Sequence, residues 1–221
     1  MPKYVPVMLD CEERVCMVIG GGHVAERKIG ELLAGSALVT VISPSVTPVL
    51  RQYYEQGKLN WLSRTYADGD LEGAFMVHAA SDDRKVNLDV AKEARARGIL
   101  VNVADQPECG SFIHPSVLRR GRLIIAVSTS GAGPLAAKAI RRKLEHDYGA
   151  EYEVYLDVLY EMRKAIRLQV NDPAARQKLL RKAGGEEVLK LLRQSAFKPW
   201  SPEKIKQWIN NNQEEKECGQ S

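Results

Sequence analysis

Short apolar runs alternate with amphipathic stretches over the first hundred residues of the chain. Five runs have the length and composition of buried strands, at residues 15–19, 38–42, 59–62, 74–80 and 99–103. After the first, second and fourth of these runs, apolar residues recur every three or four positions, which indicates helices with one buried face. This order of elements predicts an α/β fold, with helices on both faces of a mostly parallel sheet.

Residues that favour helix ends stand where this pattern needs them. Gly35 is placed to end the first helix, over residues 25–34, and Gly98 follows the third. Ser45 is expected to cap the second helix, and the run Ser81-Asp82-Asp83 the third. The first hundred residues therefore predict a doubly wound unit.

The pattern changes after Pro107. Residues 111–114 and 123–127 are expected to be strands outside the first sheet, and Pro134 to begin a helix that runs to about His146. Helical patterns then follow at residues 151–170, 173–183, 186–192 and from 202 onward. The chain thus predicts a small α+β region and a helical C-terminal part after the sheet.

Composition restricts the class of protein. The 221 residues are 44% hydrophobic, enough for an ordinary core, and no run approaches eighteen apolar residues. The N-terminus lacks the apolar segment of a signal peptide, so a cytoplasmic protein without a membrane span is expected. The four cysteines form no C-x-x-C pair, and the sequence predicts no metal site.

Charge is distributed unevenly. Of the 32 Lys/Arg and 28 Asp/Glu residues, 12 and 15 lie in residues 1–117, against 20 and 13 in residues 118–221. A basic half can attract nucleic acid or a small polyanion, and it can also consist only of solvated helix faces. Charge alone leaves these three interpretations open.

The strongest local motif is Gly20-Gly21-Gly22-His23-Val24-Ala25, which follows an expected strand and opens an expected helix. Its spacing is G-x-G-x-x-A: the first glycine permits a tight turn, the second lets the backbone approach a pyrophosphate, and the small third residue packs helix on strand. Glycine turns also join strands to helices for steric reasons alone. In this context the motif favours dinucleotide binding, with Gly20 and Gly22 at the cofactor and the phosphates at the helix N-terminus.

One part of the dinucleotide pattern is absent. An acidic residue about twenty positions on usually binds the ribose hydroxyls of NAD, but the second run is followed by Ser43-Pro44-Ser45. Either Ser43, Ser45 and backbone groups bind the ribose, or selectivity against NADP is modest. The same three residues also suit a strand end.

Asp105 is the candidate catalytic acid. It follows the fifth run at the carboxyl edge, where open α/β sheets bind their ligands, and could accept a proton from a substrate beside the nicotinamide. An ordinary turn residue before Pro107 is an equal alternative. His114, just before a proline, could face the same cleft, although a structural role is the simpler interpretation.

A second loop offers another anion site. Ser128-Thr129-Ser130-Gly131-Ala132-Gly133 joins an expected strand to an expected helix, and its hydroxyl and N–H groups could bind an anion. Basic residues flank this loop on both sides: Arg119, Arg120, Arg122, Lys138, Arg141 and Arg142. A flexible connector is the alternative, but the juxtaposition favours a carboxylate-rich ligand contacting Ser128 and Thr129.

Several motifs occur together in a fixed order: residues 20–28, Ala80-Ser-Asp-Asp83, Asn102-Val-Ala-Asp105, Ser111-Phe-Ile-His-Pro-Ser116 and Ala126-Val-Ser-Thr-Ser-Gly131. As a set they resemble the precorrin-2 dehydrogenases of siroheme synthesis, including the N-terminal part of the siroheme synthases. The resemblance covers about residues 4–146. Beyond residue 150 only the helical character is similar.

The resemblance implies a Rossmann NAD-binding domain over residues 1–113, a dimerisation region over 114–147 and a helical domain over 148–221. It implies a homodimer that oxidises precorrin-2, a tetrapyrrole, to sirohydrochlorin with NAD⁺, without nucleic acid or membrane as partner. Asp105 falls on the catalytic aspartate of the family. The NAD-contacting positions fall on Gly22, His23, Val24, Ser43, Pro44 and Ser45.

Two other functions stay open at this stage. Some members of the family also insert Fe²⁺ into sirohydrochlorin, but no metal-ligand cluster is visible here, which favours a dehydrogenase alone. An NAD(H)-sensing regulator that binds DNA through the basic half predicts a recognition helix with clustered Arg and Lys at its start. The C-terminal helices mix acidic and basic residues instead.

Overall fold

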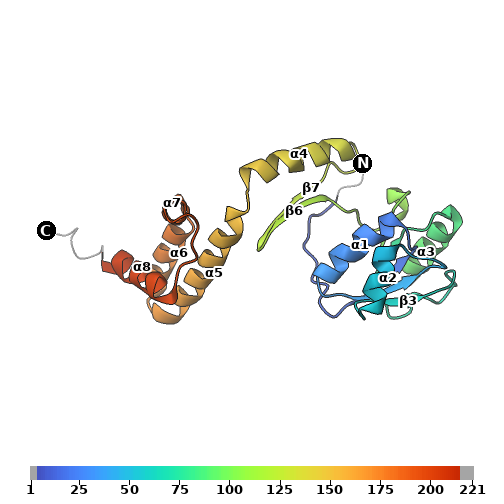
Figure 1. The fold of residues 1–221 in the computed structure, drawn as a ribbon, viewed down its shortest axis with the longest axis horizontal. Coiled ribbons are helices and arrows are strands. Elements are labelled where there is room, and N and C mark those ends of the chain that lie inside the picture. Colours follow the sequence, from blue (N-terminus) through green and yellow to red (C-terminus); the bar gives the residue numbers. More distant parts are fainter. Residues whose placement is uncertain (1–3, 215–221) are drawn as a thin grey trace. The chain divides into compact units, whose positions relative to one another are not determined.

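The five apolar runs form one parallel sheet in the computed structural model, which describes residues 4–214 (Figure 1). The sheet order is β3-β2-β1-β4-β5, and the bounds are β1 Val15–Ile19, β2 Leu38–Ile42, β3 Asn60–Leu62, β4 Met76–Ala79 and β5 Leu100–Val103. The chain reverses its direction of winding between β1 and β4. At such a switch point the loops after the two strands diverge and leave a crevice for ligands.

Helices cover both faces of this sheet, as the apolar pattern requires. Helices α1 (His23–Ala34) and α2 (Pro48–Glu55) pack on one face, where Val18 and Val41 meet Ile29 and Leu50. Helix α3 (Arg84–Ala96) packs on the other face through Val90, Ala91 and Ala94. Because both faces are buried, the strands are apolar throughout rather than alternating.

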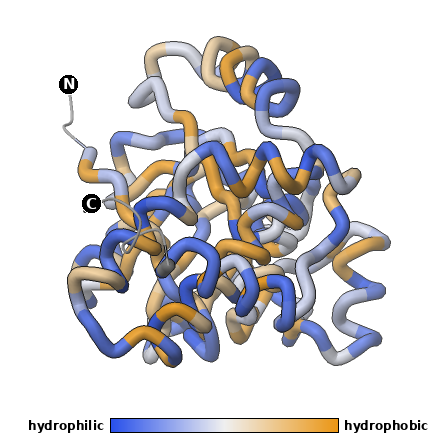
Figure 2. The backbone as a smooth tube through the Cα atoms, turned by 90° about the vertical axis from the view of Figure 1, so that its left-hand side faces the viewer, coloured by the Kyte–Doolittle hydropathy of each residue, from blue (hydrophilic) through white to orange (hydrophobic). Residues whose placement is uncertain are grey.

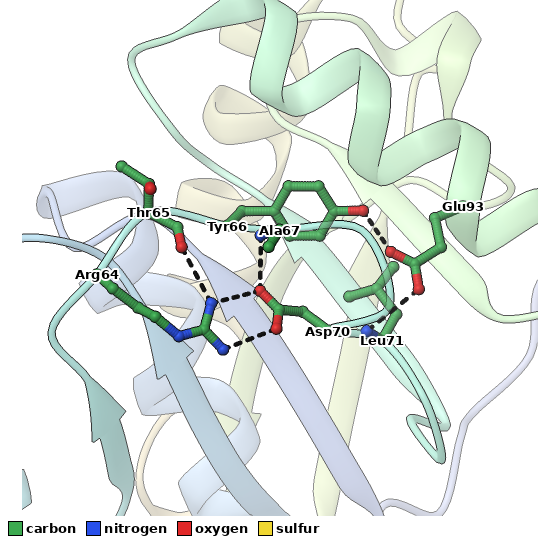
Figure 3. Close-up of polar contacts among 7 residues, drawn as sticks. All are labelled: Arg64, Thr65, Tyr66, Ala67, Asp70, Leu71 and Glu93. Atoms are coloured by element: carbon green, nitrogen blue, oxygen red, sulfur yellow. Dashed lines mark hydrogen bonds and ion pairs between the residues drawn. The ribbon is translucent and has the colours of Figure 1, made fainter.

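The connection from β3 to β4 contains no helix, and side-chain contacts hold it against α3 instead. Glu93 of α3 accepts hydrogen bonds from the Tyr66 hydroxyl and the Leu71 N–H, while Arg64 pairs with both carboxylate oxygens of Asp70 at 2.7 Å (Figure 3). Burial, together with the neighbouring Glu93, raises the pKa of Tyr66. This loop thereby takes the place of the helix that usually connects two parallel strands.

The second part of the chain has its own core. The structure divides into one unit formed by residues up to His114 with Ser130–Ala132, and another formed by Pro115–Thr129 and Gly133 onward. The latter contains a two-stranded antiparallel sheet and five helices, with bounds β6 Ser116–Arg120, β7 Leu123–Val127, α4 Pro134–Asp147, α5 Glu151–Gln169, α6 Pro173–Ala183, α7 Glu186–Gln194 and α8 Pro202–Glu214. Tyr155, Met162 and Ile166 of α5 are buried against residues of α6, α7 and α8.

In Figure 2 hydrophilic and hydrophobic stretches alternate along the helices, as one buried face per helix requires. Within residues 4–214, no helix is long and apolar enough to cross a membrane.

Two local predictions were wrong. Residues 111–114 form no strand. The N–H groups of Ser111 and Phe112 both donate to the carbonyl of Val101, so the segment does not form the successive hydrogen bonds of a strand pair. Ser45 does not cap α2. The cap is Thr47, whose hydroxyl accepts from the Leu50 N–H at 3.3 Å.

Candidate active site at the carboxyl edge of the sheet

The glycine run lies between β1 and α1, and its first two residues touch neighbouring loops. Gly20 has a φ of +118°, and a Cβ there would lie 2.3 Å from the Ala80 carbonyl oxygen. A Cβ on Gly21 would lie 2.1 Å from the Ser45 carbonyl oxygen. Both positions therefore need glycine because loops of the protein itself occupy the space, which confirms the tight turn expected at Gly20.

Gly22 is different, because nothing in the protein requires glycine there. Its φ of −82° and ψ of −175° suit any residue, and a Cβ would meet no atom within 4 Å. It is the N-cap of α1, and no side chain caps this helix end. The following residues, His23 and Val24, are exposed. The first N–H groups of α1 thus face open space, an arrangement suited to a phosphate group.

The Ser43–Ser45 segment lies directly beside the glycines. The Gly20 N–H donates to the Ile42 carbonyl at 3.0 Å, and the Thr47 N–H donates to the Gly21 carbonyl at 3.0 Å. The Ser43 hydroxyl is buried and donates to the Ser45 carbonyl at 2.7 Å. Pro44 and Ser45 are exposed, so these two residues, rather than the Ser43 hydroxyl, are accessible to a ribose.

Asp105 follows β5 and is exposed, with one carboxylate oxygen held from within the protein. The Asn87 side-chain amide of α3 donates to Asp105 Oδ1 at 3.0 Å and also to the Ser81 carbonyl at 2.9 Å. Ser81 follows β4, beside Ala80, which contacts the glycine turn. The loops after β2, β1, β4 and β5 are therefore linked in that order along one edge of the sheet.

His114 lies away from this edge. Its Nδ1 is 3.1 Å from a carboxylate oxygen of Glu31, in the third turn of α1, and its ring centroid is 4.8 Å from that of His78. The hydrogen bond from His114 is the largest cause that lowers the pKa of Glu31. The structure therefore brings together the glycines, Ser43–Ser45 and Asp105, but not His114.

Ser128 and Thr129 belong to the second unit. There the Thr129 hydroxyl accepts a hydrogen bond from the Gly133 N–H at 3.2 Å, at the beginning of α4. The loop thus joins β7 to a helix N-terminus, as the sequence predicts. A contact of Ser128 or Thr129 with substrate stays a prediction.

A buried polar cluster lies beneath α1. Lys28 Nζ donates to Asn102 Oδ1 at 2.7 Å, and His78 Nδ1 lies 3.3 Å from the same oxygen. Burial, aided by the nearby Arg27, lowers the pKa of Lys28 to about 8. Burial also lowers the pKa of His78 well below its usual value, and Nε2 of this ring has no hydrogen-bond partner within residues 4–214. His78 is thus a buried polar residue of β4 that lies beside Asn102.

Asn87 and Lys28 are buried polar residues of helices α3 and α1 to which the sequence motifs assign no role. Asn87 lies at a position where the apolar period of α3 requires a core residue, next to Val90, Ala91 and Ala94. A polar residue on an apolar stripe is a sequence signal for a buried hydrogen-bonded side chain, since burial of an amide is costly without partners.

Residues 4–214 contain no group of three His, Cys, Asp or Glu side chains placed to hold a metal ion.

Comparison with known proteins agrees with this geometry. Residues 7–116 match an NAD(P)-binding family, and residues 120–146 match the central domain of sirohaem biosynthesis proteins. Siroheme synthase 1 of Serratia proteamaculans is 37% identical over 183 residues, which are 82% of this chain and 38% of that protein. The siroheme synthase of Photorhabdus laumondii is 41% identical over 142 residues, 64% of this chain and 30% of that protein. The chain thus spans only about a third of the length of each of these relatives.

A solved structure matches over nearly the whole chain. SirC, a precorrin-2 dehydrogenase, superimposes with a TM-score of 0.78 at 30% sequence identity, covering 94% of this chain and 100% of that protein. The match extends through both units, so the helical C-terminal part is included, although the family motifs end near residue 146.

Proposed function

The chain belongs to the precorrin-2 dehydrogenase family of siroheme biosynthesis, and on that premise we propose that it oxidises precorrin-2 to sirohydrochlorin with NAD⁺. The observation that carries this proposal is the exposed face of Gly22. A glycine that the fold does not need, at a helix N-terminus without a side-chain cap, leaves room for a pyrophosphate.

In the proposed complex the N–H groups of Gly22, His23 and Val24 bind the pyrophosphate, and the exposed Pro44–Ser45 segment lies at the ribose. Gly20 supports this arrangement by holding the turn against Ala80. When bound, NAD⁺ supplies the hydride acceptor. The protein holds the two reactants together at the edge of the sheet.

The oxidation removes one hydride and one proton from the macrocycle. We assign the proton to Asp105, because its carboxylate is exposed at the carboxyl edge of the sheet and one of its oxygens is held by Asn87, which also bonds the loop after β4. The substrate also carries several carboxylates. Ser128, Thr129 and the basic residues around them are the proposed contacts for these groups, whereas His114, paired with Glu31, is left out of the proposed site.

We propose NAD⁺ rather than NADP⁺ as the preferred cofactor. The Ser63 hydroxyl donates to the Pro44 carbonyl, so the segment that begins at Ser63 adjoins the proposed ribose site. Arg64 in this segment is held by both oxygens of Asp70, and its charge is therefore balanced within its own loop. No acidic residue stands in Ser43–Ser45 to repel a 2′-phosphate, so the expected preference is modest.

The test is anaerobic incubation with enzymatically prepared precorrin-2 and either NAD⁺ or NADP⁺, followed by absorbance of sirohydrochlorin and of the reduced nicotinamide. Equal amounts of both products, formed faster with NAD⁺, are expected. A parallel reaction with Fe²⁺ tests metal insertion, which is not expected. Absence of cofactor reduction with both nucleotides would contradict the proposed activity.

A further inference from the structure

Asn87 is a buried amide whose hydrogen bonds connect two loops of the candidate site. Asn87 is only 1% exposed and lies on the face of α3 that packs against the sheet. Oδ1 accepts from the Ser81 N–H at 3.0 Å, and Nδ2 donates to the Ser81 carbonyl at 2.9 Å and to Asp105 Oδ1 at 3.0 Å. Both donor hydrogens and the acceptor are thus used.

Two of these bonds are explained by the fold alone. Ser81 leaves the sheet after β4, and its N–H and carbonyl are partly buried and need partners, which the Asn87 amide provides. The third bond is different, because Asp105 is exposed and water could solvate its carboxylate equally well. The bond satisfies the second N–H of the buried Asn87 amide, but the exposed Asp105 carboxylate does not need it for solvation. On the side of Asp105, its effect is to fix the direction of the carboxylate.

The same amide also sets where Asp105 lies relative to the glycine turn. Ala80, the neighbour of Ser81, is in contact with Gly20, whose absent Cβ would lie 2.3 Å from the Ala80 carbonyl oxygen. Asn87 therefore joins the carboxylate to the loop that packs on the proposed pyrophosphate site. Within residues 4–214 the second oxygen of Asp105 accepts no hydrogen bond, so it is available to a substrate proton.

We propose that Asn87 is a positioning residue of this site, which orients Asp105 by occupying one carboxylate oxygen and leaving the other for the proton. This inference rests on the role of Asp105 proposed above. It assigns a function to a residue that touches neither substrate nor cofactor. Replacing the Asn87 amide by a carboxylate of the same shape should place two acids at one site, and two such groups share a proton rather than ionise together.

The experiment uses the full chain with Asn87→Asp, and Asn102→Asp as the matched control. Asn102 is also buried, at 5% exposed, and its amide bonds Lys28 and Phe112 rather than Asp105. The first readout needs no activity: titration of the Asp105 side-chain carboxyl by ¹³C NMR in the cofactor-free protein. In Asn87→Asp the midpoint should rise by about one pH unit or more, whereas the control should follow the wild type.

The second readout is the pH profile of kcat/KM for precorrin-2. In Asn87→Asp its acid limb should move upward with the NMR midpoint, and kcat/KM should fall about ten- to a hundredfold at neutral pH. NAD⁺ affinity by calorimetry should stay within about threefold of the wild type, since the glycine turn is unchanged. An unshifted NMR midpoint, or a profile like that of the control, would overturn the proposal.

A double variant separates positioning from folding. Asn87→Asp combined with Asp105→Asn restores an amide–carboxylate pair across the same gap, so the thermal midpoint should recover relative to Asn87→Asp alone. Turnover should nevertheless be lost in the double variant, because its carboxylate is buried on α3. If Asp105→Asn alone turns over normally, the proposed role of Asp105 fails. If it is inactive while Asn87→Asp behaves like the control, only the role of Asn87 fails.

Discussion

At the scale of the residue, the three consecutive glycines differ in what surrounds them. The fold requires glycine at Gly20 and Gly21, but it does not require glycine at Gly22. Gly20 and Gly21 lie against carbonyl oxygens of Ala80 and Ser45, so the protein itself excludes a side chain. Gly22 faces open space. The sequence motif predicts a ligand at this turn, but it cannot distinguish a glycine needed for packing from one needed for binding.

Gly22→Val should weaken NAD⁺ binding about tenfold or more while the fold is kept, because the branched side chain fills the space that the pyrophosphate needs. Loss of glycine at an N-cap costs at most about 1 kcal/mol of stability. Gly21→Ala is the contrasting variant, since its Cβ would collide with the Ser45 carbonyl. It should lower the thermal midpoint instead. Unchanged NAD⁺ affinity in Gly22→Val by calorimetry would refute the pyrophosphate assignment.

Asp105→Asn should slow oxidation of precorrin-2 by about a hundred- to ten-thousandfold, because the amide cannot accept the proton. Binding of NAD⁺ should persist. Asparagine suits turns as well as aspartate does, so an ordinary turn residue at this position would tolerate the change. Steady-state turnover near the wild-type rate would leave Asp105 with a structural role, while the family assignment would stand.

His78 makes the folding stability depend on pH. Burial lowers its pKa in the folded protein, whereas the unfolded chain has the ordinary value near 6.5. As the pH falls through about 6.5, the unfolded state takes up a proton that the folded state does not, so stability decreases by up to about 1.4 kcal/mol per pH unit.

His78→Leu removes this titration, so denaturant unfolding between about pH 7 and pH 5 should show a smaller loss of stability than the wild type. His23→Gln is the control, because the side chain of His23 is 91% exposed and its replacement leaves the buried cluster around His78 unchanged. Equal slopes for the wild type and His78→Leu would contradict the assignment.

At the scale of the element, the apolar pattern predicts the strands well, because buried parallel strands need apolar residues on both faces. The predicted cap at Asp83 is confirmed, as its carboxylate accepts from the Lys85 N–H. The two wrong predictions, the cap of α2 and the strand at residues 111–114, lie where a local contact determines the structure. Thr47 replaces Ser45 as a cap because Pro48 begins the helix, and residues 111–114 attach to Val101 instead of pairing.

Glu93→Gln should destabilise the β3–β4 connection by about 1–3 kcal/mol, because Gln offers one acceptor oxygen where Glu93 accepts from Tyr66, Leu71 and Arg97. Lys92→Gln, on the same helix, removes only an exposed pair with Asp89 and should have little effect. The measurement is the thermal midpoint of both variants. Equal midpoints would mean that the hydrogen bonds of Glu93 contribute nothing to stability.

At the scale of the whole molecule, the apolar stripe of α5 needs a surface to pack against. The structure buries Tyr155, Val158, Met162 and Ile166 against the helices that follow in the same chain. The sequence shows that a stripe needs a partner, but it does not show whether that partner lies in the same chain. Helix α4, in contrast to α5, has Ala137 as its one buried residue.

The homodimer therefore stays a prediction, and α4 is the place to test it. Leu135 is 82% exposed and Ile140 is 46% exposed, both on this helix. Leu135→Glu should leave the fold intact, because the side chain contacts water in the single chain, but it should weaken dimerisation if α4 lies in the interface. Leu168→Glu, at a position 74% exposed on α5, is the matched control. Light scattering at micromolar concentration should report a dimer for the wild type and for Leu168→Glu, and a larger monomer fraction for Leu135→Glu. A monomeric wild type would refute the dimer, and an unchanged dimer in Leu135→Glu would move the interface away from α4.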